Sequence, residues 1–89
     1  MLTITDEAAS LIHSLTREVN AASGSGLRFT IDAHHGSLSM ALAPGASPGD
    51  AVVHFGETRV FVSPTAAERL ATRTLQASRS AERSSFFLT

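Results

Sequence analysis

The four histidines are the residues of this 89-residue chain with the clearest capacity for chemistry, because neutral imidazole nitrogens bind zinc and iron. They predict a candidate mononuclear metal site at His34, His35 and His54, which His13 or Asp32 could complete. Adjacent residues of an extended chain point to opposite faces, which argues against one ion held between His34 and His35. We favour the alternative, a polar turn with exposed imidazoles, because no recognised zinc or iron spacing is present.

Other reactive groups are scarce. The chain has no cysteine, which excludes disulfides, thiolate metal sites and a cysteine nucleophile. Serine catalysis needs a base and an oxyanion hole, and the sequence indicates neither. The glycine-containing segment 44–50 lacks the lysine of a phosphate loop and is interpreted as a connector. We therefore expect a protein that is not an enzyme.

The charge pattern restricts the partners. Seven cations, all arginine, stand against eight acidic residues, for a net charge of -1. Such a balance predicts no binding to nucleic acid or to an anionic membrane. Four of the arginines lie in the C-terminal third: Arg69, Arg73, Arg79 and Arg83. They could form a docking patch for an acidic partner, although a solvated surface is the simpler interpretation.

The length corresponds to a single domain, residues 1–89. The first ten residues lack a basic region followed by an apolar run, so we expect no signal peptide. No apolar stretch approaches the roughly 20 residues that span a bilayer. A cytoplasmic protein without a membrane segment is the expectation.

A helix is predicted over Asp6–Asn20, following a short strand at Leu2–Ile4. Thr5 is a good N-cap, and Asp6 and Glu7 place negative charge at the positive end of the helix dipole. One apolar stripe recurs at three- and four-residue spacings: Ala8, Leu11, Ile12, Leu15 and Val19.

Alternation of apolar and polar residues predicts strands over 27–33 and 38–42. Two β-prone runs predict strands over 51–55 and 58–62, and further strands are expected over 73–77 and 84–88. Gly56-Glu57 has the composition of a tight hairpin turn, and Ser63-Pro64 that of a capped helix start, with a short helix to Ala71. The order β-α-β-β-β-β-α-β-β predicts an α+β fold. We expect a compact, mostly antiparallel β barrel or sandwich with one N-terminal helix and a second short helix.

Phe86 and Phe87 lie in the last predicted strand and must face opposite sides of it. One of them is therefore expected in the core and the other on a second surface. If a phenylalanine is exposed on a terminal edge strand, the strand predicts an interface with a partner protein or with a second copy of the chain.

Four segments, in this order along the chain, carry a family resemblance: Leu2–Ala9, Gly26–Phe29, Val60–Pro64 and Ser84–Leu88. They resemble the opening strand and capped helix, the Gly-Leu-Arg-hydrophobic strand start, the strand ending in Asp-Pro and the Ser-Gly-Phe-aromatic final strand of the HesB-like family. These proteins are the A-type iron–sulfur cluster carriers. The resemblance implies one HesB-like domain, compact and β-rich, with helices packed outside.

The cysteines of that family have no counterpart here. Members that handle clusters use one cysteine in a Gly-Cys-Ser-Gly-like loop and two in a Cys-Gly-Cys motif beyond the final strand. The corresponding loop reads His34 to Met40, with the first-cysteine position at or next to His35, and the chain ends at Thr89. Clusters are held mainly by thiolates, so we expect a degenerate member with no cofactor.

Two functions remain open from the sequence. In the first, the chain is a protein-binding or accessory module that acts through a sheet edge and the surface around His35. In the second, it is a histidine-based protein that binds iron or zinc. Metal analysis after changing the histidines to alanine separates the two.

Overall fold

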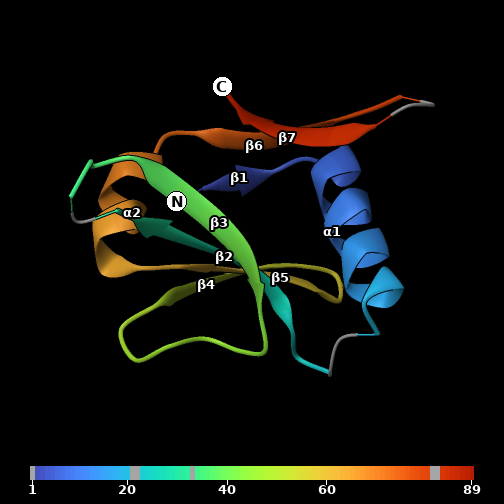
Figure 1. Ribbon diagram of the computed structural model, residues 1–89, viewed down its shortest axis with the longest axis horizontal. Helices are drawn as coiled ribbons and strands as arrows, with labels where there is room; N and C mark the ends of the chain where they lie inside the picture. The colour runs from blue at the N-terminus through green and yellow to red at the C-terminus, as the bar shows by residue number, and fades with distance from the viewer. Residues whose placement is uncertain (1, 21–22, 33, 81–82) are drawn as a thin grey trace.

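The computed structural model describes residues 2–20, 23–32, 34–80 and 83–89. Within these ranges the chain forms the predicted order of elements (Figure 1). They are β1 (Thr3–Ile4), α1 (Asp6–Glu18), β2 (Gly26–Ile31), β3 (Leu38–Ala43), β4 (Ala51–Phe55), β5 (Thr58–Val62), α2 (Pro64–Leu70), β6 (Thr74–Arg79) and β7 (Ser84–Leu88). The expectation of an α+β fold with a first helix and a second, shorter one is confirmed.

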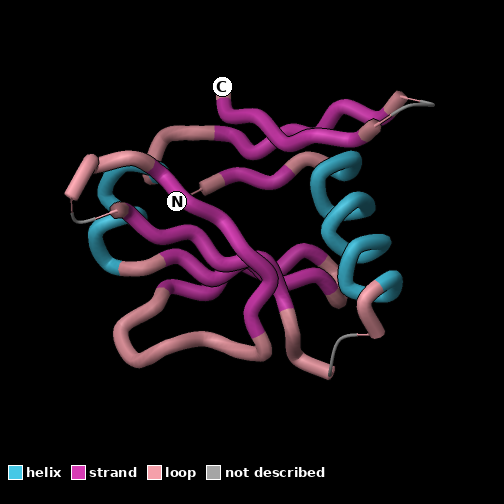
Figure 2. Tube along the Cα trace, viewed as in Figure 1, coloured by secondary structure: helices cyan, strands magenta, loops and turns pink. Residues whose placement is uncertain are grey.

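The strands form two sheets that make the layers of a sandwich (Figure 2). One sheet has the order β1-β6-β7 and the other the order β3-β2-β5-β4. The neighbours β2–β3, β4–β5 and β6–β7 are antiparallel, as expected for strands joined by short turns. The pairs β1–β6 and β2–β5 are parallel, so both sheets are mixed. Each parallel pair joins strands that are distant in the chain.

The helix α1 begins where its cap predicts. The Thr5 hydroxyl oxygen accepts a hydrogen bond from the Ala8 amide at 3.2 Å, satisfying one of the free donors of the first turn. Its apolar residues Ala8, Leu11 and Ile12 are buried, and the helix lies against β6, β5 and β2. The expected stripe is wrong at its last member, because the helix ends at Glu18 and the Val19 cap residue is 61% exposed.

The second helix, α2, is capped by Ser63, whose hydroxyl oxygen accepts from the Ala66 amide at 3.2 Å. Pro64 occupies the first helical turn, where its missing amide proton costs nothing. Ala66 and Leu70 are buried, and α2 packs on β2. Figure 1 shows α1 and α2 at opposite ends of the two sheets.

The core lies between the sheets and is closed by the helices. The largest fully buried side chains are Phe29, Ile12, Leu75, Val60 and Val62. They come from α1 and from both sheets, and burying each side chain of this size stabilises the fold by roughly 1.5–3 kcal/mol. α1 has 13 residues, and no helix within the described ranges has both the length and the hydropathy to cross a bilayer.

Candidate functional site

The β2–β3 loop, which carries two of the candidate metal ligands, is organised by Asp32. The Asp32 Oδ1 atom accepts hydrogen bonds from the His34 amide at 2.7 Å and from the His35 amide at 3.2 Å. The Gly36 amide donates to the Asp32 carbonyl at 2.8 Å, and Gly36 takes a positive φ of 65°. The bonds from the His34 and His35 amides, in that order, hold the pKa of Asp32 below its ordinary value.

The loop is also attached to α2, because the Arg69 guanidinium donates to the Gly36 carbonyl. His35 lies beside Asp32, with 3.6 Å between Nδ1 and Oδ2, and its side chain is 78% exposed. The loop thus has the character of a polar turn with solvent-exposed imidazoles, the interpretation favoured from the sequence.

His54 lies at the other end of the four-stranded sheet. His54 pairs with Arg59 of β5. The register of β5 with β2 places Arg59 level with Gly26, at the start of β2. The loop begins after Ile31, five residues further along β2, or roughly 16 Å at the rise of a strand. Two nitrogens on one zinc or iron ion lie within about 4 Å of each other, given bonds of about 2.0–2.1 Å.

The structure therefore does not bring His34, His35 and His54 together. Among the residues described, no group of three or more histidine or acidic side chains is placed to hold a metal ion. His13 lies elsewhere again, on α1, where it lines a hollow beside the β4–β5 turn. The histidine site stays a prediction that no contact in this structure supports.

A polar hollow lies where α1 meets the β4–β5 turn. Its charged and ionisable lining residues are His13, Arg17, Glu57 and Arg59. The C-terminal carbonyl end of α1, with its partial negative charge, disfavours an anion there, and Glu57 offsets one of the arginines. The hollow has no clear match to a ligand class.

A second hollow lies between the edge strands of the two sheets, β3 and β7. It has a volume of about 190 Å³ and is lined by Phe29, Leu38, Ser39, Met40, Leu75, Phe86, Phe87 and Leu88. An adjoining hollow of about 230 Å³ continues towards α2 and is lined by Leu38, Arg69, Leu70, Arg73 and Leu88. Because Leu38 and Leu88 line both, the two form one surface, here called the β3–β7 groove.

The groove is open because the β1-β6-β7 sheet covers β2 but leaves part of the neighbouring edge strand β3 exposed. Met40 pairs with Phe29 and Leu42 pairs with Leu27, so all four side chains lie on the inner face of the sheet. Phe29 and Leu27 are only 1% and 3% exposed, whereas Met40 and Leu42 are 45% and 37% exposed. The inner face of the sandwich is therefore uncovered at Met40 and Leu42, whereas Leu38 of the same strand packs against the core.

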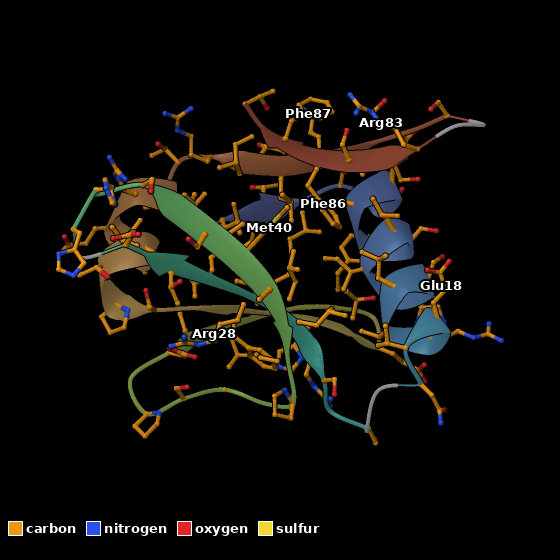
Figure 3. The ribbon with its side chains drawn as sticks, viewed as in Figure 1. Glu18, Arg28, Met40, Arg83, Phe86 and Phe87 are labelled. Carbon is orange, nitrogen blue, oxygen red and sulfur yellow. The ribbon has the colours of Figure 1, made fainter. Side chains whose placement is uncertain are left out.

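The other wall of the groove is β7. Phe86 packs against the core, while Phe87 is 44% exposed, which confirms that the two rings serve different surfaces. Figure 3 shows Phe86 and Phe87 on opposite faces of β7, with Phe86 on the side of Met40. The strands β3 and β7 are both sheet edges, and neither contains a charged residue or a proline. Such residues are the usual protection of an edge strand against pairing with another chain.

One ion pair that the sequence did not indicate fastens the β3–β4 loop to β2. Arg28 donates from Nε and Nη2 to the two carboxylate oxygens of Asp50, each at 2.9 Å, and the Asp50 side chain is inaccessible to solvent. The Arg28 hydrogen bond lowers the pKa of Asp50, and the Asp50 hydrogen bond raises the pKa of Arg28. The two residues are 22 positions apart, so no local pattern reveals the pair.

The same loop contains Gly45-Ala46-Ser47-Pro48-Gly49, which matches the Gly-x-Ser-x-Gly spacing of a nucleophile elbow. The elbow requires a strand before the serine and a helix after it, whereas this segment joins β3 to β4. The Ser47 amide donates to Asp50 at 2.8 Å, so the segment serves the loop. It supports no serine chemistry.

Comparison with solved structures supports the expected fold. The chain resembles Escherichia coli SufA, a protein involved in biosynthesis of iron–sulfur clusters, with a TM-score of 0.76 and 19% identity over 99% of this chain and 83% of that one. A protein from Aquifex aeolicus gives a TM-score of 0.76 at 18% identity, over 99% of this chain and 89% of its own. IscA with the [2Fe-2S] cluster gives a TM-score of 0.72 at 16% identity, over 100% of this chain and 81% of that one.

No protein-family model and no curated protein matches the sequence. At these identities the three structures establish the fold, and the resemblance to the HesB-like A-type carriers is confirmed at that level. The fold family implies an iron–sulfur cluster as cargo. The residues present do not fit one, because the chain has no cysteine and its histidines do not converge.

Proposed function

We propose that this chain is a non-enzymatic, cytoplasmic accessory protein that binds another protein through the β3–β7 groove. It would use the scaffold of SufA and IscA without carrying a cluster. The observation that carries the proposal is the exposure of Met40 in the groove, on the inner face of an unprotected edge strand. Biosynthesis of iron–sulfur clusters, the setting of SufA, is the setting we propose for this accessory role.

The energetics favour a protein partner. Covering the exposed half of Met40 would return about 1 kcal/mol, since full burial of such a residue is worth roughly 1.5–3 kcal/mol. The edge strands can add backbone hydrogen bonds with an extended segment of the partner. The lining of the groove includes no carboxylate and no imidazole within the described residues, which supports binding rather than catalysis.

The test uses two glutamate substitutions at exposed apolar residues. Met40→Glu places a charge in the groove, while Val19→Glu places one at the end of α1, away from the groove. A protein retained by the immobilised chain from a lysate of the source cells is purified, and its affinity for the three forms of the chain is measured by calorimetry. We expect M40E to weaken binding at least tenfold and V19E to leave the affinity within twofold of wild type.

Equal affinity of all three forms for the purified partner would overturn the proposal. Thermal unfolding of each variant serves as the control for folding. Both residues are already exposed, so we expect both variants to unfold close to the wild-type temperature.

A further inference from the structure

The β3–β7 groove is apolar in its middle and carries positive charge at its α2 end. Its middle is apolar, from Phe29 and Leu75 at the floor to Met40 and Phe86 at the walls. Its end at α2 is lined by the two arginines Arg69 and Arg73, together with leucines. A partner that fills the groove must therefore match apolar surface along most of its length and positive charge at one end.

The two arginines at the α2 end are not paired with a carboxylate among the described residues, although Glu68 precedes Arg69 on α2 and offsets part of the charge. Arg69 donates to a neutral acceptor, the Gly36 carbonyl, and neither Arg69 nor Arg73 forms an ion pair in the part of the chain that the structure describes. The nearby Asp32 carboxylate accepts from the loop amides instead. Guanidinium groups bind carboxylates in a planar, two-pronged geometry, so an acidic group is the matching ligand.

The edge strands of a second copy do not supply that acidic group. They are β1, β7, β3 and β4, and none of them contains aspartate or glutamate. Asp50, next to β4, is inaccessible and bonded to Arg28. A nucleic acid or an anionic lipid surface would need a wider basic field than two arginines in a chain of net charge -1.

We infer that the groove binds an extended protein segment whose alternate apolar side chains enter the hollow between β3 and β7, with an aspartate or glutamate side chain against Arg69 and Arg73. The inference rests on the proposed function and specifies its partner. The acidic residue sets the direction of the segment, because only the α2 end of the groove carries the two guanidinium groups. The unprotected edges of β3 and β7 provide the backbone donors and acceptors that hold the segment extended.

The test is a selection of displayed random nine-residue peptides against the whole chain, followed by affinity measurement on synthetic peptides. The selection is run on the wild type and on three variants. Arg73→Glu removes the net positive charge of the α2 end because Arg69 remains, M40E blocks the apolar middle, and Arg83→Glu makes the same substitution at the far end of β7. Figure 3 shows Arg83 at that far end. Arg69 donates to the β2–β3 loop, whereas no side-chain hydrogen bond joins Arg73 to the described residues of that loop.

We expect the wild type to select peptides with apolar residues at alternate positions and an acidic residue at one end. Replacing that acidic residue by its amide should weaken binding about fivefold, the effect of losing one partly exposed ion pair. R73E should select apolar peptides without the acidic preference, R83E should select the wild-type sequences, and M40E should select no peptides of this class.

Each other outcome contradicts the inference. Apolar peptides without an acidic preference on the wild type, or the same sequences on R73E as on wild type, would overturn the acidic partner and leave the proposed function standing. A basic preference that appears only with R83E would place the charged contact at the far end of β7, and not at the α2 end, which contradicts the inference. Failure of any peptide to bind, together with a wild-type dimer that M40E dissociates in sedimentation, would make a second copy the occupant. Failure to bind without self-association would count against the proposed function as well.

Discussion

Gly26 is the position at which the smallest change should have the largest effect on this fold. A Cβ atom added there would lie 2.2 Å from the carbonyl oxygen and 2.9 Å from the carbonyl carbon of Arg59. The first distance is about 0.8 Å short of the 3.0 Å that Cβ atoms keep from other atoms. The obstacle is backbone of β5, which is paired with β2 on one side and with β4 on the other, so it cannot move aside alone.

We therefore expect Gly26→Ala to lower the free energy of unfolding by about 3 kcal/mol, the upper part of the range for overpacked sites. That is a large part of the roughly 4–13 kcal/mol typical of a domain this size. With a urea dependence near 1 kcal/mol per molar, the unfolding midpoint should fall by about 3 M. Because Gly26 does not have a left-handed φ, the loss comes from the contact alone.

The matched control is Gly45→Ala, the same substitution at a loop glycine. No atom lies within 4 Å of the Cβ that this change adds, and Gly45 does not have a positive φ. The midpoint should stay unchanged or rise slightly, since alanine restricts the unfolded chain and can stabilise by about 0.4–1 kcal/mol. Urea unfolding followed by circular dichroism measures both. Equal midpoints for G26A and G45A would refute the close approach of β2 to β5.

Three further predictions concern the acidic side chains, the α2 cap and the missing cluster ligands. The folded protein lowers the pKa of Asp32 and of Asp50, so each carboxylate adds stability above its unfolded pKa of about 3.8 and loses it as the pH falls through its folded pKa. The variant D50N should therefore show a smaller fall in the urea midpoint below pH 4. An unchanged pH dependence of the midpoint would contradict this. Ser63→Ala should lower the free energy of unfolding by about 1 kcal/mol because it removes the cap of α2. Ser85 is exposed on β7, so Ser85→Ala should change this free energy by less than about 0.5 kcal/mol. Equal losses for the two variants would argue against the cap. Anaerobic incubation with iron and sulfide should leave no stoichiometric cluster absorbance on the desalted chain, and one stable cluster per chain would show that the ligand argument is wrong.

The sequence predicted the β3–β7 groove only in part. The alternation at Phe86 and Phe87 correctly indicated one inward and one exposed ring, because that depends only on neighbouring residues. Met40 belongs to an equally regular alternation, yet its exposure depends on how far the opposite sheet extends. The same limit explains Val19, which continues the apolar spacing of α1 but lies past the end of the helix.

The amino-acid sequence by itself determined the type and order of the elements, together with the caps at Thr5 and Ser63. These depend on residues within about four positions of one another, where periodicity and hydrogen bonding act directly. Only the tertiary structure decided the parallel pairing of β2 with β5, the burial of Asp50 against Arg28 and the separation of His54 from the β2–β3 loop. Each of these depends on which distant segments become neighbours, and that is set by the packing of the whole core.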